Sequence, residues 1–225
     1  MNQMREKHLA VLRRHMVELI AIYVELASGE LGKATLDPRL LAVMERVPRH
    51  RFVPESLAAA AYHDMPLPIG FDKTISQPFI VAVMTDLLAP LPNETVLEVG
   101  TGLGYQTAVL AQLARQVWSV EVVEELALGA ELRLRQLGCS NVGIRVGDGS
   151  RGWEEHSPFD KILVTAAAEP VPPALLEQLR PGGRMVLPVG GEEAQVLTVL
   201  DKAPLGRVTR RQVLPVRFSR LETMP

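Results

Sequence analysis

The sequence predicts an α/β protein with a mostly parallel, doubly wound sheet. From residue 95 onward, apolar runs of strand length alternate with segments of helical spacing. This repeated strand–helix–strand order implies right-handed crossovers, parallel neighbours and helices on both faces of the sheet. The 17 glycines and 17 prolines cluster at the ends of the apolar runs, where turns between strands and helices need them.

The expected elements of the alternating part can be placed along the chain. Strands are expected at residues 96–100, 117–121, 142–147, 161–165 and 184–189, and helices at residues 105–113, 124–137 and 172–179. Residues 195–200 and 208–217 are two further apolar or alternating runs with no convincing helix between them. They predict a terminal hairpin-like pair that includes an antiparallel strand.

Two helices are expected near the start of the chain. Apolar side chains recur at helical spacing over residues 9–27, and Ser28-Gly29 is a stop signal. Asp37 followed by Pro38 is typical of a helix cap and first turn. This pair predicts a second helix that ends near Val47.

Length and composition favour one compact domain. The chain has 225 residues, 47% of them hydrophobic and 22% charged, which is enough to bury a sizeable core. Residues 54–78 show no regular periodicity, and we expect them to form functional loops. Residues 1–94 are therefore expected to supply N-terminal helices and covering loops, and residues 95–225 the sheet-containing core.

The charge of the chain argues against a general nucleic-acid or membrane partner, because the formal net charge is only −2. Lys and Arg nevertheless outnumber Asp and Glu by nine to six in residues 1–51 and by six to two in residues 201–225. These basic ends could meet an anionic substrate, or they could balance charge on solvated helix faces.

Neither cysteine nor histidine indicates a metal site. Cys139 is the only cysteine, and the five histidines are scattered without metal-ligand spacing, so no metal is expected. No apolar stretch reaches the roughly 18 residues of a membrane span, and the start of the chain has no small-residue cleavage site. We therefore expect a cytoplasmic protein. A monomer or a weak homo-oligomer is also expected.

The sharpest motif is a glycine-rich turn after the first expected strand of the sheet. Gly100, Gly102 and Gly104 follow an apolar run and precede a helix. Glycine permits positive φ and lets a ligand approach the backbone closely. A dinucleotide fingerprint would place its third glycine three residues after the second. The observed spacing therefore disfavours a nicotinamide-dependent dehydrogenase.

Two acidic residues stand at the ends of the next two expected strands. Glu121 could accept hydrogen bonds from both hydroxyls of a ribose. Asp148, between Gly147 and Gly149, could accept one from an adenine amino group. Each residue has an ordinary alternative role, because Glu121 could cap the next helix and Asp148 could form an Asx turn. Together with the glycine turn, the two acids favour a nucleoside site at the carboxyl edge of the sheet.

Several segments match the motifs of one known family. They are VPRHRFVP (47–54), LPIG (67–70), TISQP (74–78), GTGLG (100–104), GDG (147–149), VTAAA (164–168), QLRPGGR (178–184) and LPVG (187–190). From Val47 to Phe218 the chain thus resembles the protein-L-isoaspartate (D-aspartate) O-methyltransferases. The glycine loop marks only the wider methyltransferase superfamily, whereas the segment 74–78 is specific.

The resemblance implies a Rossmann-like fold that binds S-adenosyl-L-methionine at the strand edge and the substrate under the N-terminal loops. It implies that Ser76 is the catalytic residue and contacts the reacting carboxylate. The implied cofactor-binding residues are Ile75, Gln77, Gly100, Thr101, Gly102, Gly104, Glu121, Val122, Asp148, Gly149 and Thr165. The implied substrate-binding residues are Leu67, Pro68, Ile69 and Thr74.

The implied activity is methyl transfer to the free carboxylate of L-isoaspartyl or D-aspartyl residues in damaged proteins or peptides. S-adenosyl-L-homocysteine would be the product, and the ester would start repair through a succinimide. Asp72 and Lys73 depart from the family pattern, and the N-terminal helix is longer than in most bacterial members. These departures leave open an aspartate methyltransferase that tailors a dedicated peptide.

A nonenzymatic adaptor that keeps the cofactor pocket is a further alternative. It would need a damaged transfer site, and the intact segment from Thr74 to Ser76 argues against it. A serine hydrolase is disfavoured because no Gly-x-Ser-x-Gly elbow surrounds Ser76.

Overall fold

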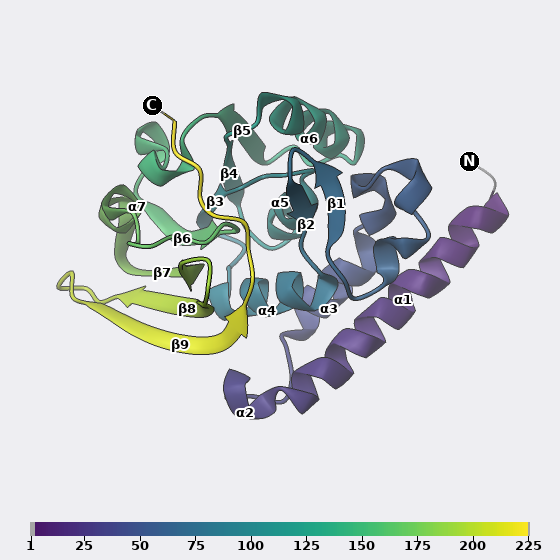
Figure 1. Cartoon of the computed structure of the whole chain (residues 1–225), viewed down its shortest axis with the longest axis horizontal. Coiled ribbons are helices and arrows are strands. Elements are labelled where there is room, and N and C mark those ends of the chain that lie inside the picture. Colours follow the sequence, from purple (N-terminus) through teal and green to yellow (C-terminus); the bar gives the residue numbers. More distant parts are fainter. Residues whose placement is uncertain (1–2, 225) are drawn as a thin grey trace.

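A seven-stranded sheet forms the centre of the computed structural model, which describes residues 3–224 (Figure 1). In sheet order the strands are β5 (Val142–Val146), β4 (Gln116–Glu121), β3 (Thr95–Val99), β6 (Phe159–Val164), β7 (Leu179–Gly190), β8 (Gln195–Lys202) and β9 (Val208–Val216). The first five pair in parallel, whereas β8 pairs antiparallel with both β7 and β9. The predicted α/β class, the mostly parallel sheet and the terminal antiparallel pair are confirmed.

The helices of the described chain pack around this sheet. They are α1 (Gln3–Leu26), α2 (Ser28–Leu31), α3 (Pro38–Arg46), α4 (Pro78–Leu88), α5 (Tyr105–Ala111), α6 (Glu124–Gln136) and α7 (Pro173–Gln178). The two helices expected near the start are α1 and α3. Asp37 caps α3 as predicted, because its carboxylate accepts a hydrogen bond of 2.8 Å from the Arg39 amide. Within residues 3–224, no helix combines the length and apolarity needed to cross a membrane.

Regular structure lies in three places where it was not expected. The short helix α2 begins at Ser28, within the expected stop signal, two residues after α1 ends at Leu26. Helix α4 has nine buried residues out of eleven, so it shows no polar face that periodicity could reveal. Strands β1 (Leu67–Gly70) and β2 (Lys73–Ile75) form an antiparallel hairpin and are too short to show alternation. The expectation of loops throughout residues 54–78 was therefore wrong at this hairpin.

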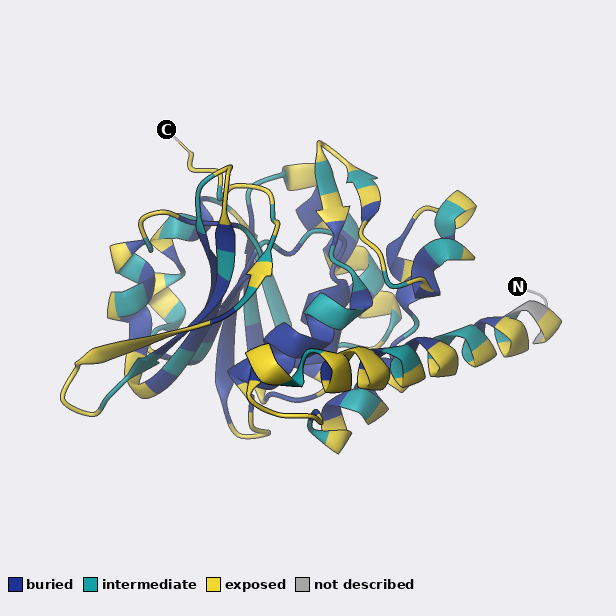
Figure 2. Cartoon of the chain, turned by 60° about the horizontal axis from the view of Figure 1, so that its bottom comes forward, coloured by how far each residue is buried: buried dark blue, intermediate teal, exposed yellow. Residues whose placement is uncertain are grey.

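The sheet is buried on both faces. Because successive strand residues point to opposite sides, Val96 and Leu163 pack on the face that carries α3 to α6, whereas Leu97 and Ile162 pack on the other. On the second face Leu175 of α7 joins the same apolar cluster. All five side chains are completely buried, and Figure 2 shows the buried strands enclosed by helices with exposed outer faces.

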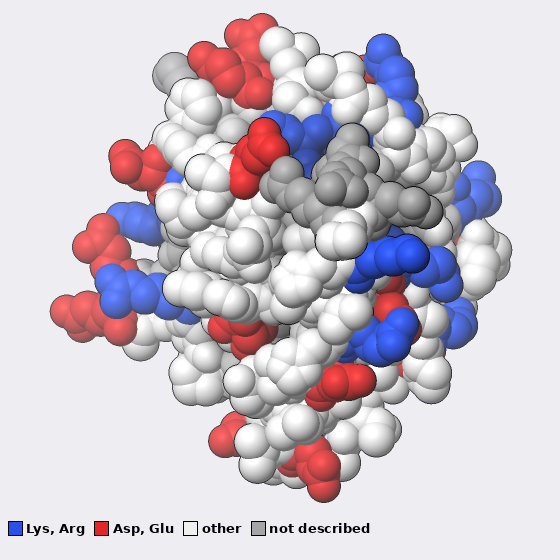
Figure 3. Space-filling model, turned by 90° about the vertical axis from the view of Figure 1, so that its right-hand side faces the viewer, with Lys and Arg blue, Asp and Glu red and all other residues white. Residues whose placement is uncertain are grey.

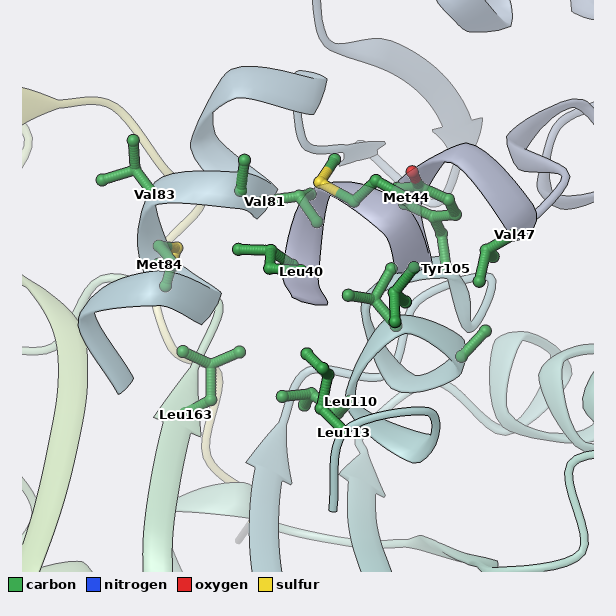
Figure 4. Close-up of a cluster of buried hydrophobic side chains, with 14 of the residues drawn as sticks. Leu40, Met44, Val47, Val81, Val83, Met84, Tyr105, Leu110, Leu113 and Leu163 are labelled. Atoms are coloured by element: carbon green, nitrogen blue, oxygen red, sulfur yellow. The ribbon is translucent and has the colours of Figure 1, made fainter. Parts of the chain in front are cut away.

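The N-terminal helices share the core of the sheet. Met44 of α3, Val81 and Met84 of α4 and Tyr105 of α5 belong to one apolar cluster with Leu163 of β6 (Figure 4). This packing places the segment between β2 and α4 beside the carboxyl edge of the sheet.

The chain order changes direction at β3. Strands β4 and β5 lie on one side of β3, and β6 and β7 lie on the other. Ligands of open parallel sheets bind in the crevice outside the carboxyl ends of the strands at such a point. The glycine loop follows β3 and Thr165 follows β6, so the topology brings both to this crevice.

Replacing Leu97 tests the central position of β3. Leu97→Ala is expected to lower the free energy of unfolding by about 2–5 kcal/mol, because a buried cavity would remain. Leu128 on α6 is 57% exposed, so Leu128→Ala should change that free energy by less than about 0.5 kcal/mol. Urea denaturation measures both variants, and equal losses would contradict the described core.

Candidate active site

A cavity of about 570 Å³ lies at the carboxyl ends of β3, β4 and β6. It is lined by the glycine loop and strand ends, by the hairpin with the segment leading into α4, and by the C-terminal segment. The predicted site residues among its lining are Ile69, Thr74, Ser76, Gln77, Gly100, Gly102, Glu121, Val122, Gly149 and Thr165. The fold thus brings most of the predicted site together around one space.

The other predicted site residues lie behind this surface or beside it. Ile75 and Thr101 line an adjoining recess of about 60 Å³. Leu67 is buried in the core and Pro68 is exposed on β1. Gly104 and Asp148 line neither space. Direct contact of these residues with a ligand stays a prediction.

The glycine loop is shaped by close backbone approaches. Gly100, Gly102 and Gly104 have φ of +94°, +54° and +92°, a region that favours glycine. A Cβ on Gly100 would lie 2.3 Å from Oγ1 of Thr165, and one on Gly104 would lie 3.2 Å from Cδ1 of Leu134. Gly100 is therefore required by the neighbouring strand end, whereas Gly104 allows α5 to pack closely against α6.

Glu121 stands at the end of β4 and is almost completely buried at the cavity wall. Its Oε2 accepts a hydrogen bond of 2.7 Å from the Gly102 amide, and its Oε1 accepts one of 3.1 Å from the Val123 amide. A carboxylate offers about four acceptor sites, so about two remain for a ligand. The residue can therefore hold the glycine loop and still bind a diol.

Asp148 forms the Asx-type cap that sequence analysis weighed as its ordinary alternative. Its Oδ1 accepts hydrogen bonds from the amide and hydroxyl of Ser150, at 2.8 and 2.6 Å, and its Oδ2 accepts one from the Met224 amide at 3.3 Å. Burial acts to raise the pKa of Asp148, but these hydrogen bonds outweigh it and lower the pKa. Its neighbour Gly149 reaches the cavity, where a Cβ would lie 2.3 Å from Cγ1 of Val99.

Ser76 and Gln77 occupy the connection between β2 and α4, and both line the cavity. Asp64 holds the start of α4, because its carboxylate accepts a hydrogen bond of 2.7 Å from the Phe79 amide. It also accepts a longer one, of 3.3 Å, from the side-chain amide of Gln77. The connection is therefore anchored at its helical end.

Residues 217–222, the C-terminal strap, contribute a wall that sequence analysis did not foresee (Figure 1, yellow trace after β9). Ala167 holds the strap through two backbone hydrogen bonds of 2.8 Å. Its amide donates to the Ser219 carbonyl, and its carbonyl accepts from the Leu221 amide. Lys73 of β2 forms an ion pair with Glu222, although the two are 149 residues apart. The sequence shows only that residues 201–225 are basic, and this charge does not indicate which residues the strap contacts.

Glu98 supports the glycine loop from inside the protein. Its Oε2 accepts hydrogen bonds of 2.6 Å from the hydroxyls of Thr107 and Ser119, and the Ser119 hydroxyl is 2.6 Å from that of Thr101. Complete burial raises the pKa of Glu98 to about 7, although both hydrogen bonds act to lower it. This network joins α5, β4 and the loop, and sequence analysis assigned it no role.

Comparison with known sequences decides the family. The family model described as protein-L-isoaspartate(D-aspartate) O-methyltransferase matches residues 26–223. The chain belongs to this family. A protein-L-isoaspartate O-methyltransferase of Polaromonas sp. is 54% identical over 219 residues, which cover 97% of this chain and 93% of that protein. A protein-L-isoaspartate O-methyltransferase of Anaeromyxobacter dehalogenans is 58% identical over 191 residues, which cover 84% of this chain and 91% of that protein.

Solved structures show the same methyltransferase fold. A protein-L-isoaspartate O-methyltransferase structure matches 92% of this chain with a TM-score of 0.78 and 26% identity, and this chain spans 65% of its length. A Plasmodium falciparum structure described as such an enzyme with S-adenosyl-L-homocysteine matches 94% of this chain and 99% of its own, with a TM-score of 0.78 and 22% identity. The predicted Rossmann-like methyltransferase fold is thereby confirmed.

The two residues that depart from the family pattern lie at the hairpin. Phe71 and Asp72 form its turn with φ of +54° and +53°, which residues other than glycine rarely adopt. Lys73 lines the cavity and pairs with Glu222. Asp72 and Lys73 therefore belong to the hairpin, and neither is part of the glycine loop or of β4.

Glu98→Gln tests the buried carboxyl through the pH dependence of stability. The folded pKa near 7 exceeds the ordinary value of 4.5, so the folded wild type keeps a proton that the unfolded chain releases. Raising the pH from 5 to 8 should therefore destabilise the wild type, relative to the uncharged glutamine variant, by up to about 3 kcal/mol.

Urea denaturation of both proteins at pH 5 and pH 8 measures this difference. Glu193→Gln, in an exposed loop, is the control and should track the wild type at both pH values. A stability difference between Glu98→Gln and the wild type that does not change with pH would contradict the described network.

Proposed function

We propose that this chain transfers the methyl group of S-adenosyl-L-methionine to the free carboxylate of L-isoaspartyl or D-aspartyl residues in damaged proteins or peptides. The methyl ester then starts repair through a succinimide. The observation that carries the proposal is the shared cavity, which is lined by Glu121 and the glycine loop on one side and by Ser76 on the other. Family membership and the names of the close relatives support the substrate class.

The residues present fit S-adenosyl-L-methionine. The glycine loop lets the methionine part approach the backbone, and the free acceptor sites of Glu121 suit the two hydroxyls of a ribose. Val122, Gly149 and Thr165 would complete the walls around the nucleoside. When bound, the cofactor supplies an electrophilic methyl group on a sulfonium centre.

The protein needs no general base for this transfer. An aspartyl-type carboxyl has a pKa near 3.9 in peptides, so the acceptor is already an anion at neutral pH. The task of the chain is to orient the acceptor oxygen in line with the methyl group and to exclude water. Positioning of this kind is worth up to about 7–11 kcal/mol. Ser76 would donate its hydroxyl hydrogen to the acceptor carboxylate and attack nothing.

Predicted site residues outside the cavity surface would act through their neighbours. Gly104 sets the spacing of α5 and α6 behind the loop, and Asp148 shapes the turn that presents Gly149 to the adenine. Leu67 and Pro68 build the strand that carries Ile69, while Ile75 and Thr101 line the recess behind Ser76.

We further propose that the protein works in the cytoplasm as a monomer or weak homo-oligomer, without a nucleic-acid or membrane partner. Its formal net charge is −2, and basic and acidic groups lie interspersed on the face shown in Figure 3. Residues 1–94 would cover the substrate and residues 95–225 would bind the cofactor, as parts of one domain.

A pair of peptides that differ only in the aspartyl linkage tests the substrate class. Methylation is expected for the isoaspartyl peptide and not for its normal aspartyl twin, and mass spectrometry of the methyl ester measures it. Transfer to the normal peptide alone would favour tailoring of a dedicated peptide. Binding of S-adenosyl-L-homocysteine without any transfer would favour an adaptor.

Ser76→Ala tests the acceptor site. We expect kcat/KM for the isoaspartyl peptide to fall about ten- to a hundredfold, which matches the loss of one hydrogen bond to a charged group. Cofactor affinity, measured by calorimetry, should stay within about twofold. Ser28→Ala in α2 is the matched control and should keep full activity. Loss of cofactor binding by Ser76→Ala would instead assign the residue to the cofactor pocket.

A further inference from the structure

Arg49 joins three segments that are distant in sequence. It lies in the 3₁₀ turn at Arg49–Phe52 and is completely buried. Its Nε donates a hydrogen bond of 2.8 Å to the Ala61 carbonyl, and its Nη2 donates one of 2.7 Å to the Ser76 carbonyl. The planar guanidinium offers donors in a fixed fork, so it sets the direction of both carbonyls.

Asp64 is near enough to interact electrostatically with Arg49, but no direct ion pair between Arg49 and a carboxylate is found among the described residues. The buried Nη1 of Arg49 has no hydrogen-bond partner. Its Cζ lies 4.7 Å from the centre of the Tyr105 ring, which is a favourable cation–π contact. Burial lowers the pKa of Arg49 to about 10, so the group is still a cation at neutral pH.

A buried cation without a direct ion pair is unfavourable for folding, and an apolar side chain could fill the same space. The backbone carbonyl of Ser76 accepts the hydrogen bond from Arg49, and Ser76 also lines the cavity. Asp64 accepts a hydrogen bond from the Phe79 amide in the first turn of α4. The connection that carries Ser76 is therefore held by Arg49 at Ser76 and by Asp64 at Phe79.

We propose that Arg49 is a positioning residue for methyl transfer, which holds Ser76 in place and sets a buried positive charge behind the acceptor carboxylate. The proposal rests on the assignment of Ser76 to that carboxylate. The acceptor is an anion before transfer and a neutral ester afterwards. The charge of Arg49 therefore favours the bound substrate more than the product, and its loss should appear in KM.

Arg49→Lys and Arg49→Met separate charge from packing. We expect KM for the isoaspartyl peptide to rise about tenfold in the lysine variant and up to about a hundredfold in the methionine variant, with kcat changed less than threefold. The lysine variant keeps the positive charge but cannot donate to the Ala61 and Ser76 carbonyls in the planar geometry of a guanidinium. Affinity for S-adenosyl-L-homocysteine, measured by calorimetry, should stay within about twofold in each variant that folds.

Arg115→Lys is the matched control. The Arg115 guanidinium also bonds main-chain and hydroxyl oxygens, at Asn93 and Thr95, but at the opposite end of β3 from the cavity. This variant should keep the wild-type KM. If Arg49→Met does not fold, the comparison of Arg49→Lys with Arg115→Lys decides the question.

A double variant tests the path through Ser76. Combined with Ser76→Ala, Arg49→Lys should add little further loss, because the two residues act on the same bond. A wild-type KM for Arg49→Lys, fully additive losses, or a parallel loss of kcat and cofactor affinity would each overturn the role of Arg49. Full activity of Ser76→Ala would overturn the assignment of Ser76, and this inference with it.

Discussion

The approach of β6 to β3 sets the geometry on which the whole cavity depends. Thr165 donates from its amide to the Val99 carbonyl at 2.9 Å and from its hydroxyl to the Gly100 carbonyl at 2.8 Å. These bonds turn the chain out of β3 at the carboxyl edge and leave no space for a side chain at position 100. The glycine loop, the end of β4 and the segment before α4 are all arranged around this junction.

Buried polar groups of the chain also hold the glycine loop. Glu98 holds it from inside through Ser119 and Thr101, and Glu121 holds it at the cavity through the Gly102 amide. Because the chain supplies these bonds itself, they restrict the conformations that the loop can adopt. The carboxylate of Glu121 thus holds the loop and keeps acceptor sites for the ribose contact that we propose.

Local sequence patterns predicted those parts of the site in which neighbours in the chain act together. The strand, the glycine turn and Glu121 at the next strand end follow from residue types and spacing, and the structure places them as expected. Asp148 was more ambiguous because an Asx turn and a ligand contact use the same carboxylate, and the hydrogen bonds to Ser150 show that the turn is formed.

Contacts between distant segments could not be predicted in this way. The pairing of Lys73 with Glu222 and the bond from Arg49 to the Ser76 carbonyl depend on where the sheet order and the helix packing bring the segments. Helix α4 was missed for a different reason, because burial on nearly every side removes the amphipathic signal.

The placement of the two ends of the described chain has a practical consequence for labelling and immobilisation. The first turn of α1 lies at the tip of a helix that extends away from the sheet, as Figure 2 shows. Met224 instead bonds to Asp148, two residues after the end of the strap that lines the cavity. A fluorophore or surface tether joined near the start of α1 would therefore stand away from the strap, whereas one joined after residue 224 would lie beside Asp148 and the strap.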